Sequence, residues 1–271
     1  MALPLVLAGP IVRRVEARLC TIWIALSEAA EVEVTLWDGA QFMGPNPGLV
    51  ASGDAPIALN SKPTRRFGEH LHVAVVTVPF PNQPMLPGHT YSYDVEFSGS
   101  FGNSSLRNAG LLKDEKSNAR IAGVHPDAPL HLALGYLENR LPSFIQPGAT
   151  LESLRIVHAS CRRPGATSQH DAMAWLDDII KQTQDDTLER PQQLYLTGDQ
   201  IYADDVQETL LPMLNGLGQE LLGPEELPVS DKRLAVTLTN FPAARRSKLL
   251  RFEAKFSTGD AANHLMSFGE Y

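Results

Sequence analysis

Two short segments of this 271-residue chain place reactive side chains directly after apolar runs. In the first segment Cys161 follows such a run, and Arg162 and Arg163 come next. Two arginines beside a cysteine favour its thiolate, and they can also grip the oxygens of a phosphate. Three interpretations of Cys161 stay open: a small buried residue, a nucleophile with His158 or His170 as its base, or a metal ligand.

The second segment, at positions 198–205, reads GDQIYADD. Its glycine lets the backbone turn as a strand ends, so that the carboxylate of Asp199 projects above the sheet edge within reach of a metal. Tyr202 lies about one helical turn further on, so its phenol can approach the same point. Carboxylate and phenolate are hard oxygen donors that suit Fe(III). Asp204 and Asp205 either add carboxylates to such a site or form the acidic first turn of a helix.

The apolar pattern around these segments predicts a parallel sheet. Leu154–Ala159 and Gln193–Thr197 are short apolar runs typical of buried strands, and Ser168–Lys181 between them has apolar residues at helical spacing. Strand, helix and strand of these lengths form a βαβ unit, in which ligands bind outside the carboxyl ends of the strands. A second helix is predicted over Tyr202–Leu214, ended or kinked by Pro212.

The first hundred residues predict a β-sandwich. Short apolar strands alternate with turns rich in glycine and proline, and these strands are Leu19–Leu26, Glu31–Trp37, His70–Val78 and Tyr91–Phe97. One tyrosine of the stretch PGHTYSY is expected to form the tyrosine corner of such a sandwich. We therefore expect an immunoglobulin-like or fibronectin-like all-β domain at 1–110, a linker at 111–150 that docks at residues 141–144, and a partial α/β domain at 151–271.

Composition limits the partners of the chain. Its 31 acidic residues outnumber 23 lysines and arginines, giving a net charge of −8 that disfavours non-specific nucleic-acid binding. No run of 18 apolar residues predicts a membrane span, and the apolar N-terminus lacks the features of a secretion signal. With only two cysteines, Cys20 and Cys161, far apart in the chain, we expect no disulfide framework. We expect a cytoplasmic protein with no membrane partner.

Taken together, the runs RIVHASCRRPG and LYLTGDQIYADDV resemble the PhoD-like (alkaline phosphatase D) metallophosphatases. The run AGPIVRRVEARLCTIWIAL resembles the N-terminal sandwich of that family, LGYLENRLPSFIQPG its connector and NHLMSFGEY a later segment. The resemblance implies a phosphomonoesterase or phosphodiesterase that uses iron, often with calcium, on a small phosphate-ester substrate. It implies that Cys161, Asp199 and Tyr202 are metal-site residues, with Asp199 bridging two metals. Arg162 or Arg163 would stabilise the charge that develops on the phosphoryl group.

The chain departs from the family pattern after the second segment. The family has further blocks with an Asn-His or Asp-His ligand pair and additional histidines, whereas this chain ends at Tyr271. Asn263 and His264 mimic such a pair, but no strand precedes them, and Asp260–Tyr271 has a helical pattern. We therefore expect a C-terminally truncated half-domain with impaired activity. Its exposed sheet edge would pair with a second copy, as a homo-oligomer, or with the missing half.

Two alternatives to this function stay open. The first is a non-catalytic binding module that carries a degenerate phosphatase remnant, which would not retain iron. The second is a hydrolase with Cys161 as its nucleophile and a histidine as its base, which would be sensitive to thiol alkylation and independent of metal.

Overall fold

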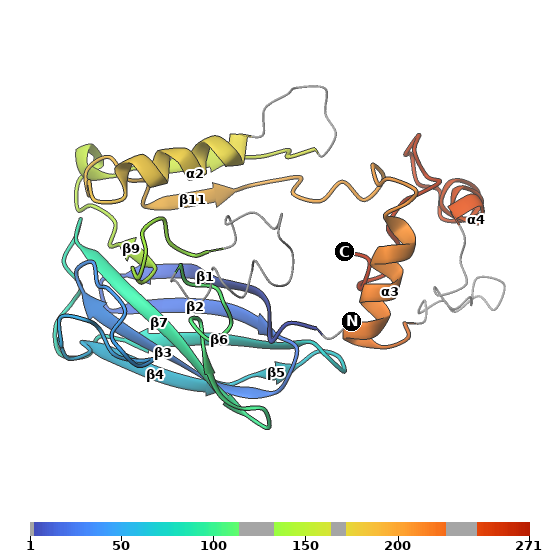
Figure 1. The fold of residues 1–271 in the computed structure, drawn as a ribbon. Coiled ribbons are helices and arrows are strands. Elements are labelled where there is room, and N and C mark those ends of the chain that lie inside the picture. Colours follow the sequence, from blue (N-terminus) through green and yellow to red (C-terminus); the bar gives the residue numbers. More distant parts are fainter. Residues whose placement is uncertain (1–2, 114–132, 164–171, 226–242) are drawn as a thin grey trace. The chain divides into compact units, whose positions relative to one another are not determined.

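The computed structural model describes residues 3–113, 133–163, 172–225 and 243–271 (Figure 1). The chain divides into two compact units. The first unit comprises Met1–Arg66, His72–Val157 and Met173–Leu194, and the second comprises Phe67–Leu71, His158–Ala172 and Tyr195–Tyr271. Much of the predicted linker, residues 114–132, lies outside the described residues.

The first unit is built around two antiparallel sheets that share one core. In pairing order, the strands of one sheet are β1 (Val6–Glu16), β2 (Leu19–Leu26), β6 (His72–Pro79) and β5 (Arg65–Arg66). Those of the other are β4 (Ala58–Pro63), β3 (Ala30–Asp38), β7 (Thr90–Gly99) and β8 (Gly102–Ser105), and β9 (Ser143–Ile145) also pairs with β7. The arrangement confirms the predicted all-β domain.

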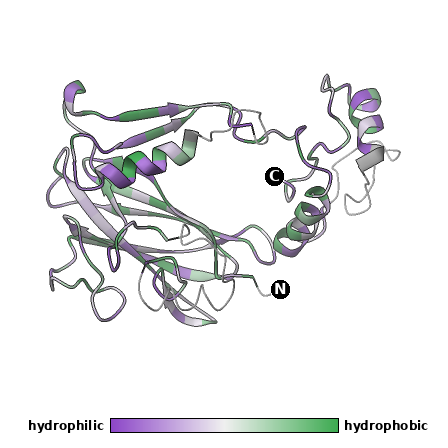
Figure 2. Ribbon diagram, turned by 45° about the horizontal axis from the view of Figure 1, so that its top comes forward, coloured by the Kyte–Doolittle hydropathy of each residue, from purple (hydrophilic) through white to green (hydrophobic). Residues whose placement is uncertain are grey.

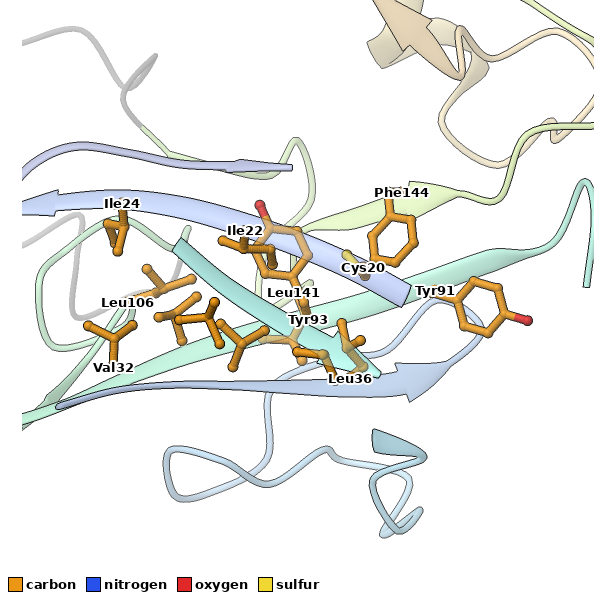
Figure 3. Packing of buried hydrophobic residues seen from close by; sticks show 14 of the residues in the cluster. Cys20, Ile22, Ile24, Val32, Leu36, Tyr91, Tyr93, Leu106, Leu141 and Phe144 are labelled. Atoms are coloured by element: carbon orange, nitrogen blue, oxygen red, sulfur yellow. The ribbon is translucent and has the colours of Figure 1, made fainter. Parts of the chain in front are cut away.

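The apolar side chains that face the opposite sheet form a core between the two sheets. Side chains of β2 and β3 point toward one another there (Figure 3), and the fully buried ones include Ile22, Ile24, Leu26, Val32, Val34 and Leu36. Each such side chain contributes about 1.5–3 kcal/mol by leaving water. Cys20 belongs to the same cluster, and burial raises the pKa of its thiol to about 12. Cys20 is therefore a packing residue, and both cysteines are free thiols.

The sequence did not predict five strands of the sandwich, β1, β4, β5, β8 and β9, of which β1 and β4 are the longest. β1 covers the apolar N-terminal stretch and runs antiparallel to β2, from Val6 opposite Leu26 to Glu16 opposite Leu19. β4 has the mixed sequence ALNSKP and forms because its backbone pairs with β3. In both cases the neighbouring strand, and not the local alternation of side chains, decides the conformation.

The predicted docking of the connector is confirmed. Leu141 and Phe144 are buried in the core of the first unit, and the Phe144 ring stacks on Tyr91 with centroids 5.9 Å apart. The Tyr91 hydroxyl accepts a hydrogen bond of 2.8 Å from the backbone N–H of Leu86, five residues upstream. Tyr91 therefore makes the side-chain-to-backbone contact expected of the tyrosine corner.

The predicted strand, helix and strand follow in order as β10 (Ile156–Ala159), α2 (Ala172–Thr183) and β11 (Gln193–Leu196), after a short 3₁₀ turn, η2 (Leu151–Ser153). The backbone N–H of Gln193 donates to Arg155 O, and that of Thr197 donates to Ala159 O. Because these bonds advance in the same direction along both strands, the pair is parallel. The predicted start of the helix, Ser168, lies outside the described residues.

Ion pairs and hydrogen bonds join the connector to α2 and to the turn after it, all within the first unit. The hydroxyl of Tyr136 donates to Asp177 Oδ1 at 2.6 Å, and Arg140 Nη2 lies 2.5 Å from Asp185 Oδ1. Arg190 donates to the carbonyl oxygen of Ser143 at 2.6 Å. These contacts hold the connector to α2 and to the turn after it within the first unit.

The second unit corrects the predicted helix at Tyr202–Leu214. The helix α3 spans Leu211–Leu222, and Pro212 lies in its first turn instead of ending a helix that began earlier. Proline is favoured there because the first N–H groups of a helix have no intrahelical acceptor. The following helix, α4 (Ala243–Lys248), continues into one π-helical turn, η4 (Leu249–Glu253). No helix within the described ranges is long and apolar enough to cross a membrane.

The predicted helical pattern over Asp260–Tyr271 is also wrong, because this segment is irregular. The carboxylate of Glu270 accepts from the backbone N–H groups of Met266 and Ser267. That of Glu225 accepts from those of Phe268 and Gly269. These carboxylates take the backbone donors that a helix would use.

Candidate metal and phosphate site

Backbone hydrogen bonds join the loops that follow β10 and β11. The N–H of Cys161 donates to Gly198 O at 3.0 Å, and that of Arg162 donates to Asp199 O at 3.1 Å. The parallel pairing thus continues beyond the ends of both strands. The two segments singled out by their residue types meet at one sheet edge, as the βαβ pattern predicted.

The three predicted metal ligands gather at this edge. The Cys161 thiol donates to Asp199 Oδ2 at 3.3 Å, and Tyr202 is near enough to interact with the same thiol. Partial desolvation, the interaction with Cys161 and the charge of Asp199 raise the pKa of the Tyr202 phenol, while Arg163 opposes the shift. A thiol, a carboxylate and a phenol therefore share one exposed point on the molecule.

Two of these residues have strained backbones. Cys161 has a φ of 57° and Asp199 a φ of 46°, both in the left-handed region. Aspartate tolerates that region better than cysteine does, and a residue with a Cβ is generally disfavoured there by about 1–2 kcal/mol. Such strain collects at ligand-binding sites, where the surrounding structure holds it in place. Here it turns both side chains toward each other.

The two arginines differ in their surroundings. Arg163 Nε lies 2.5 Å from Asp205 Oδ2, and this contact raises the pKa of Arg163 and lowers that of Asp205. Arg162 is exposed and contributes its backbone N–H to the loop pairing with Asp199. The structure therefore places Asp205 with Arg163 in an ion pair.

The other acidic residue of the second segment serves the loop. Asp204 Oδ2 accepts a hydrogen bond of 2.8 Å from the Thr258 hydroxyl. Next to it, the backbone N–H of Leu265 donates to Ala203 O at 2.7 Å. Asp204 thus ties the loop to the segment near the C-terminus.

The pair Asn263-His264 has contacts of its own. The His264 ring packs edge-on against Phe256 with centroids 5.8 Å apart, and its Nδ1 lies 2.5 Å from Leu265 O. Asn263 is half-buried. Across the described residues, no group of three or more His, Cys, Asp or Glu side chains lies close enough to hold a metal ion. Within these ranges, then, His264 does not join Cys161 and Asp199.

Sequence reasoning missed one neighbour of Cys161 and the side-chain partner of His158. Ser160 Oγ lies 3.1 Å from the thiol sulfur, and only its adjacency in sequence could have indicated this. The candidate base closer to Cys161 in the sequence is His158, and its Nε2 lies 2.6 Å from the hydroxyl oxygen of Thr197. The other candidate base, His170, lies outside the described residues.

The chemistry of the donor set favours a ferric ion over calcium. Carboxylate and phenolate oxygens are hard donors that suit Fe(III), whereas a thiolate is a soft donor that calcium does not take. Calcium takes six to eight oxygen ligands. Around Asp199, the nearby carboxylates Asp204 and Asp205 bind Thr258 and Arg163. Calcium therefore remains an expectation from the family resemblance.

No protein-family model matches the chain, and comparison with curated proteins gives no match. Among solved structures, a glycosyl hydrolase family 2 (GH2) member from Bacteroides cellulosilyticus is similar with a TM-score of 0.25 and 9% sequence identity. The match covers 84% of this chain and 33% of that one, so the chain spans about a third of the protein it matches. A likeness this weak carries no argument about fold or function.

Proposed function

We propose that this protein hydrolyses phosphate esters, monoesters or diesters, with the help of a ferric ion held by Cys161, Asp199 and Tyr202. The observation that carries the proposal is the meeting of thiol, carboxylate and phenol at the carboxyl ends of two parallel strands. The strained backbones of Cys161 and Asp199 support it, because they turn two of the three donors together.

A bound ferric ion would polarise a phosphoryl oxygen and lower the pKa of water. Side chains of the protein would bind the substrate and stabilise its developing charge. Arg163, whose charge acts on Tyr202, would bind a second phosphoryl oxygen and stabilise the negative charge that grows there. By the family resemblance, Asp199 would also help to hold a second ion, calcium.

Part of the proposal is that further ligands come from additional protein, either a second copy of the chain or the second half of an α/β domain. Parallel strands are normally covered on both faces. Several large apolar side chains of β10, α2 and β11 are instead exposed, among them Ile156, Trp175, Leu194 and Leu196. In Figure 2, green apolar stretches alternate with purple along α2.

Metal binding by an Asp199→Asn variant tests the proposal. The substitution keeps the size of the side chain and removes the anionic oxygen. We expect the unchanged 271-residue chain to bind ferric iron weakly and the variant to lose this binding, measured by iron content after dialysis. Asp204→Asn is the matched control, because Asp204 binds Thr258 and should not alter the iron content. Equal iron in the Asp199→Asn variant and the unchanged chain would contradict the assignment.

A further inference from the structure

We propose that Asp205 is a positioning residue for Arg163: it holds the guanidinium beside Cys161, Asp199 and Tyr202, where a phosphate oxygen would be bound. This inference rests on the proposed function. It assigns Asp205 to the anion side of the site, whereas the sequence pattern offered it as a further metal ligand or an acidic helix start.

The contact itself leaves the arginine able to bind an anion. Arg163 meets Asp205 Oδ2 through Nε, which is one of the five N–H donors of a guanidinium. One carboxylate oxygen therefore fixes the direction of the side chain without occupying its whole hydrogen-bonding edge. An arginine that is already oriented loses less rotamer freedom when it binds a phosphate.

The loop that carries Asp205 is held on several sides. The backbone N–H of Asp205 donates to Tyr202 O at 3.1 Å, and Ala203 O accepts from Leu265 N–H at 2.7 Å. Between them, Asp204 accepts from the Thr258 hydroxyl. Because the same short loop carries Tyr202 and Asp205, it couples the position of Arg163 to that of the candidate metal ligands.

The contacts of Arg163 place it beside the candidate ligands. Its backbone N–H donates to Cys161 O at 3.0 Å, and its Nε meets Asp205 on the loop that carries Tyr202. Asp205, Asp260 and Asp204 form an acidic rim around the guanidinium, and each raises the pKa of Arg163. The same acidic rim allows an opposite role for Asp205, in which its carboxylate competes with phosphate for the arginine.

The sign of one mutational effect separates the two roles. Removing a negative carboxylate near the site should strengthen the binding of negative phosphate if only charge repulsion matters. If Asp205 positions Arg163, Asp205→Ala should instead weaken the binding of inorganic phosphate to the iron-loaded chain by about fivefold, and Asp205→Glu should restore part of it. Isothermal titration calorimetry measures both. Asp260→Ala is the charge control, for which unchanged or tighter binding is expected.

A double-mutant cycle tests whether Asp205 acts through Arg163. Arg163→Ala should weaken phosphate binding by about tenfold, and adding Asp205→Ala to it should have no further effect. Tighter binding by the Asp205→Ala variant, or the same loss with and without Arg163, would overturn the positioning role.

A readout without phosphate separates this inference from the proposed function. The Nε–H resonance of Arg163 in a ¹H–¹⁵N spectrum should shift in the Asp205→Ala variant. An unshifted resonance would refute the positioning role and leave the proposed function standing. If the resonance shifts but the unchanged chain binds no phosphate, the ion pair is real, and both the positioning role and the proposed function fail.

Discussion

At the scale of single residues, each potential ligand of the site is of a type that has an ordinary structural role in most proteins. A lone free cysteine is most often a packing residue, as Cys20 is within β2 of the sandwich. Cys161 differs because it is exposed, has a left-handed backbone and donates its thiol proton to Asp199. The combination of these features, and not the cysteine by itself, indicates a ligand site.

The visible absorption spectrum of the ferric-loaded protein tests whether Cys161 and Tyr202 bind iron. Thiolate and phenolate are electron-rich donors, and either one bound to Fe(III) should give a charge-transfer band in the visible spectrum. We expect the ferric-loaded protein to be coloured, and Cys161→Ser or Tyr202→Phe to shift or bleach the band. Tyr271→Phe, at an exposed tyrosine, should leave it unchanged. A colourless protein that retains iron would exclude both residues as ligands.

Stability against pH tests a buried carboxyl of the sandwich. Burial raises the pKa of Asp94 to about 6 from 3.8, Glu96 adds to the shift, and hydrogen bonds from the Val95 and Gly48 backbone and the charge of Arg107 oppose it. Because the folded-state pKa lies above the unfolded one, Asp94 favours folding at low pH. This contribution is lost as pH rises through about 6.

The loss expected for Asp94 is on the order of 3 kcal/mol between pH 4 and pH 7. Urea unfolding of the sandwich, followed at both pH values, measures it. Asp94→Asn should remove most of this pH dependence. A variant with the same pH dependence as the unchanged chain would show that another group is responsible.

At the scale of elements, helix α3 contains two glycines whose surroundings differ. Gly218 is buried against the backbone of Gly269, and a Cβ at Gly218 would lie 2.7 Å from Gly269 O. A Cβ at Gly216 would meet nothing within 4 Å. The close approach of the helix to the segment near the C-terminus therefore requires a glycine at one position and not at the other.

Two alanine substitutions in α3 should have opposite effects. Gly216→Ala should stabilise the helix by about 0.5–1 kcal/mol, because alanine loses less backbone entropy than glycine does. Gly218→Ala should destabilise it by about 1–3 kcal/mol, because the added methyl group forces the two backbones apart. Hydrogen exchange of the α3 amides reports both changes. Equal protection in the two variants would show that α3 does not pack on Gly269.

At the scale of the whole molecule, the two units are stabilised differently. The first has a continuous apolar core between two sheets. In the second, the largest fully buried side chains include those of Arg246 and Glu270, which form an ion pair at 2.6 Å. Arg246 also donates to His264 O at 2.6 Å. The second unit thus combines a buried charge pair with a few buried apolar side chains, among them Leu211, Leu250 and Leu265, whereas the first is built on a large hydrophobic core.

Breaking that pair should unfold the segment near the C-terminus selectively. Glu270→Gln leaves Arg246 buried without its counter-charge, and we expect a loss of about 3–5 kcal/mol. Hydrogen exchange should rise at the amides of Met266 and Ser267, which donate hydrogen bonds to the Glu270 carboxylate. The amides of the sandwich should stay protected. Glu220→Gln, at an exposed position of α3, is the control. Unchanged exchange at both amides would contradict the role of the pair.

Acid should weaken the same pair. Burial alone would raise the pKa of Glu270, but Arg246 and the backbone N–H groups of Met266 and Ser267 lower it overall. A carboxylate whose pKa is lower in the folded state than in the unfolded state stabilises the fold fully at pH values above its unfolded-state pKa. The stabilisation from Glu270 is therefore lost as pH falls through the folded-state pKa.

Much of the framework was readable from the sequence by itself. Alternation in Glu31–Trp37 placed Val32, Val34 and Leu36 in a core, and all three are fully buried. Short apolar runs around a helical stretch predicted the parallel pair β10 and β11. Because the carboxyl ends of parallel strands lie at one edge, this pattern also predicted that Cys161 and Asp199 would meet. Local periodicity determines such features, since it follows from backbone geometry.

Other features were decided by contacts between residues far apart in the chain. Arg163 and Asp205 are 42 positions apart, and neither residue type reveals the pairing. A helical pattern near the C-terminus gave way to an irregular segment, because Glu225 and Glu270 accept its backbone N–H groups. Periodicity describes which side chains could share a face. The tertiary structure alone determines which donor finds which acceptor, because that depends on distances in space and not on spacing in the sequence.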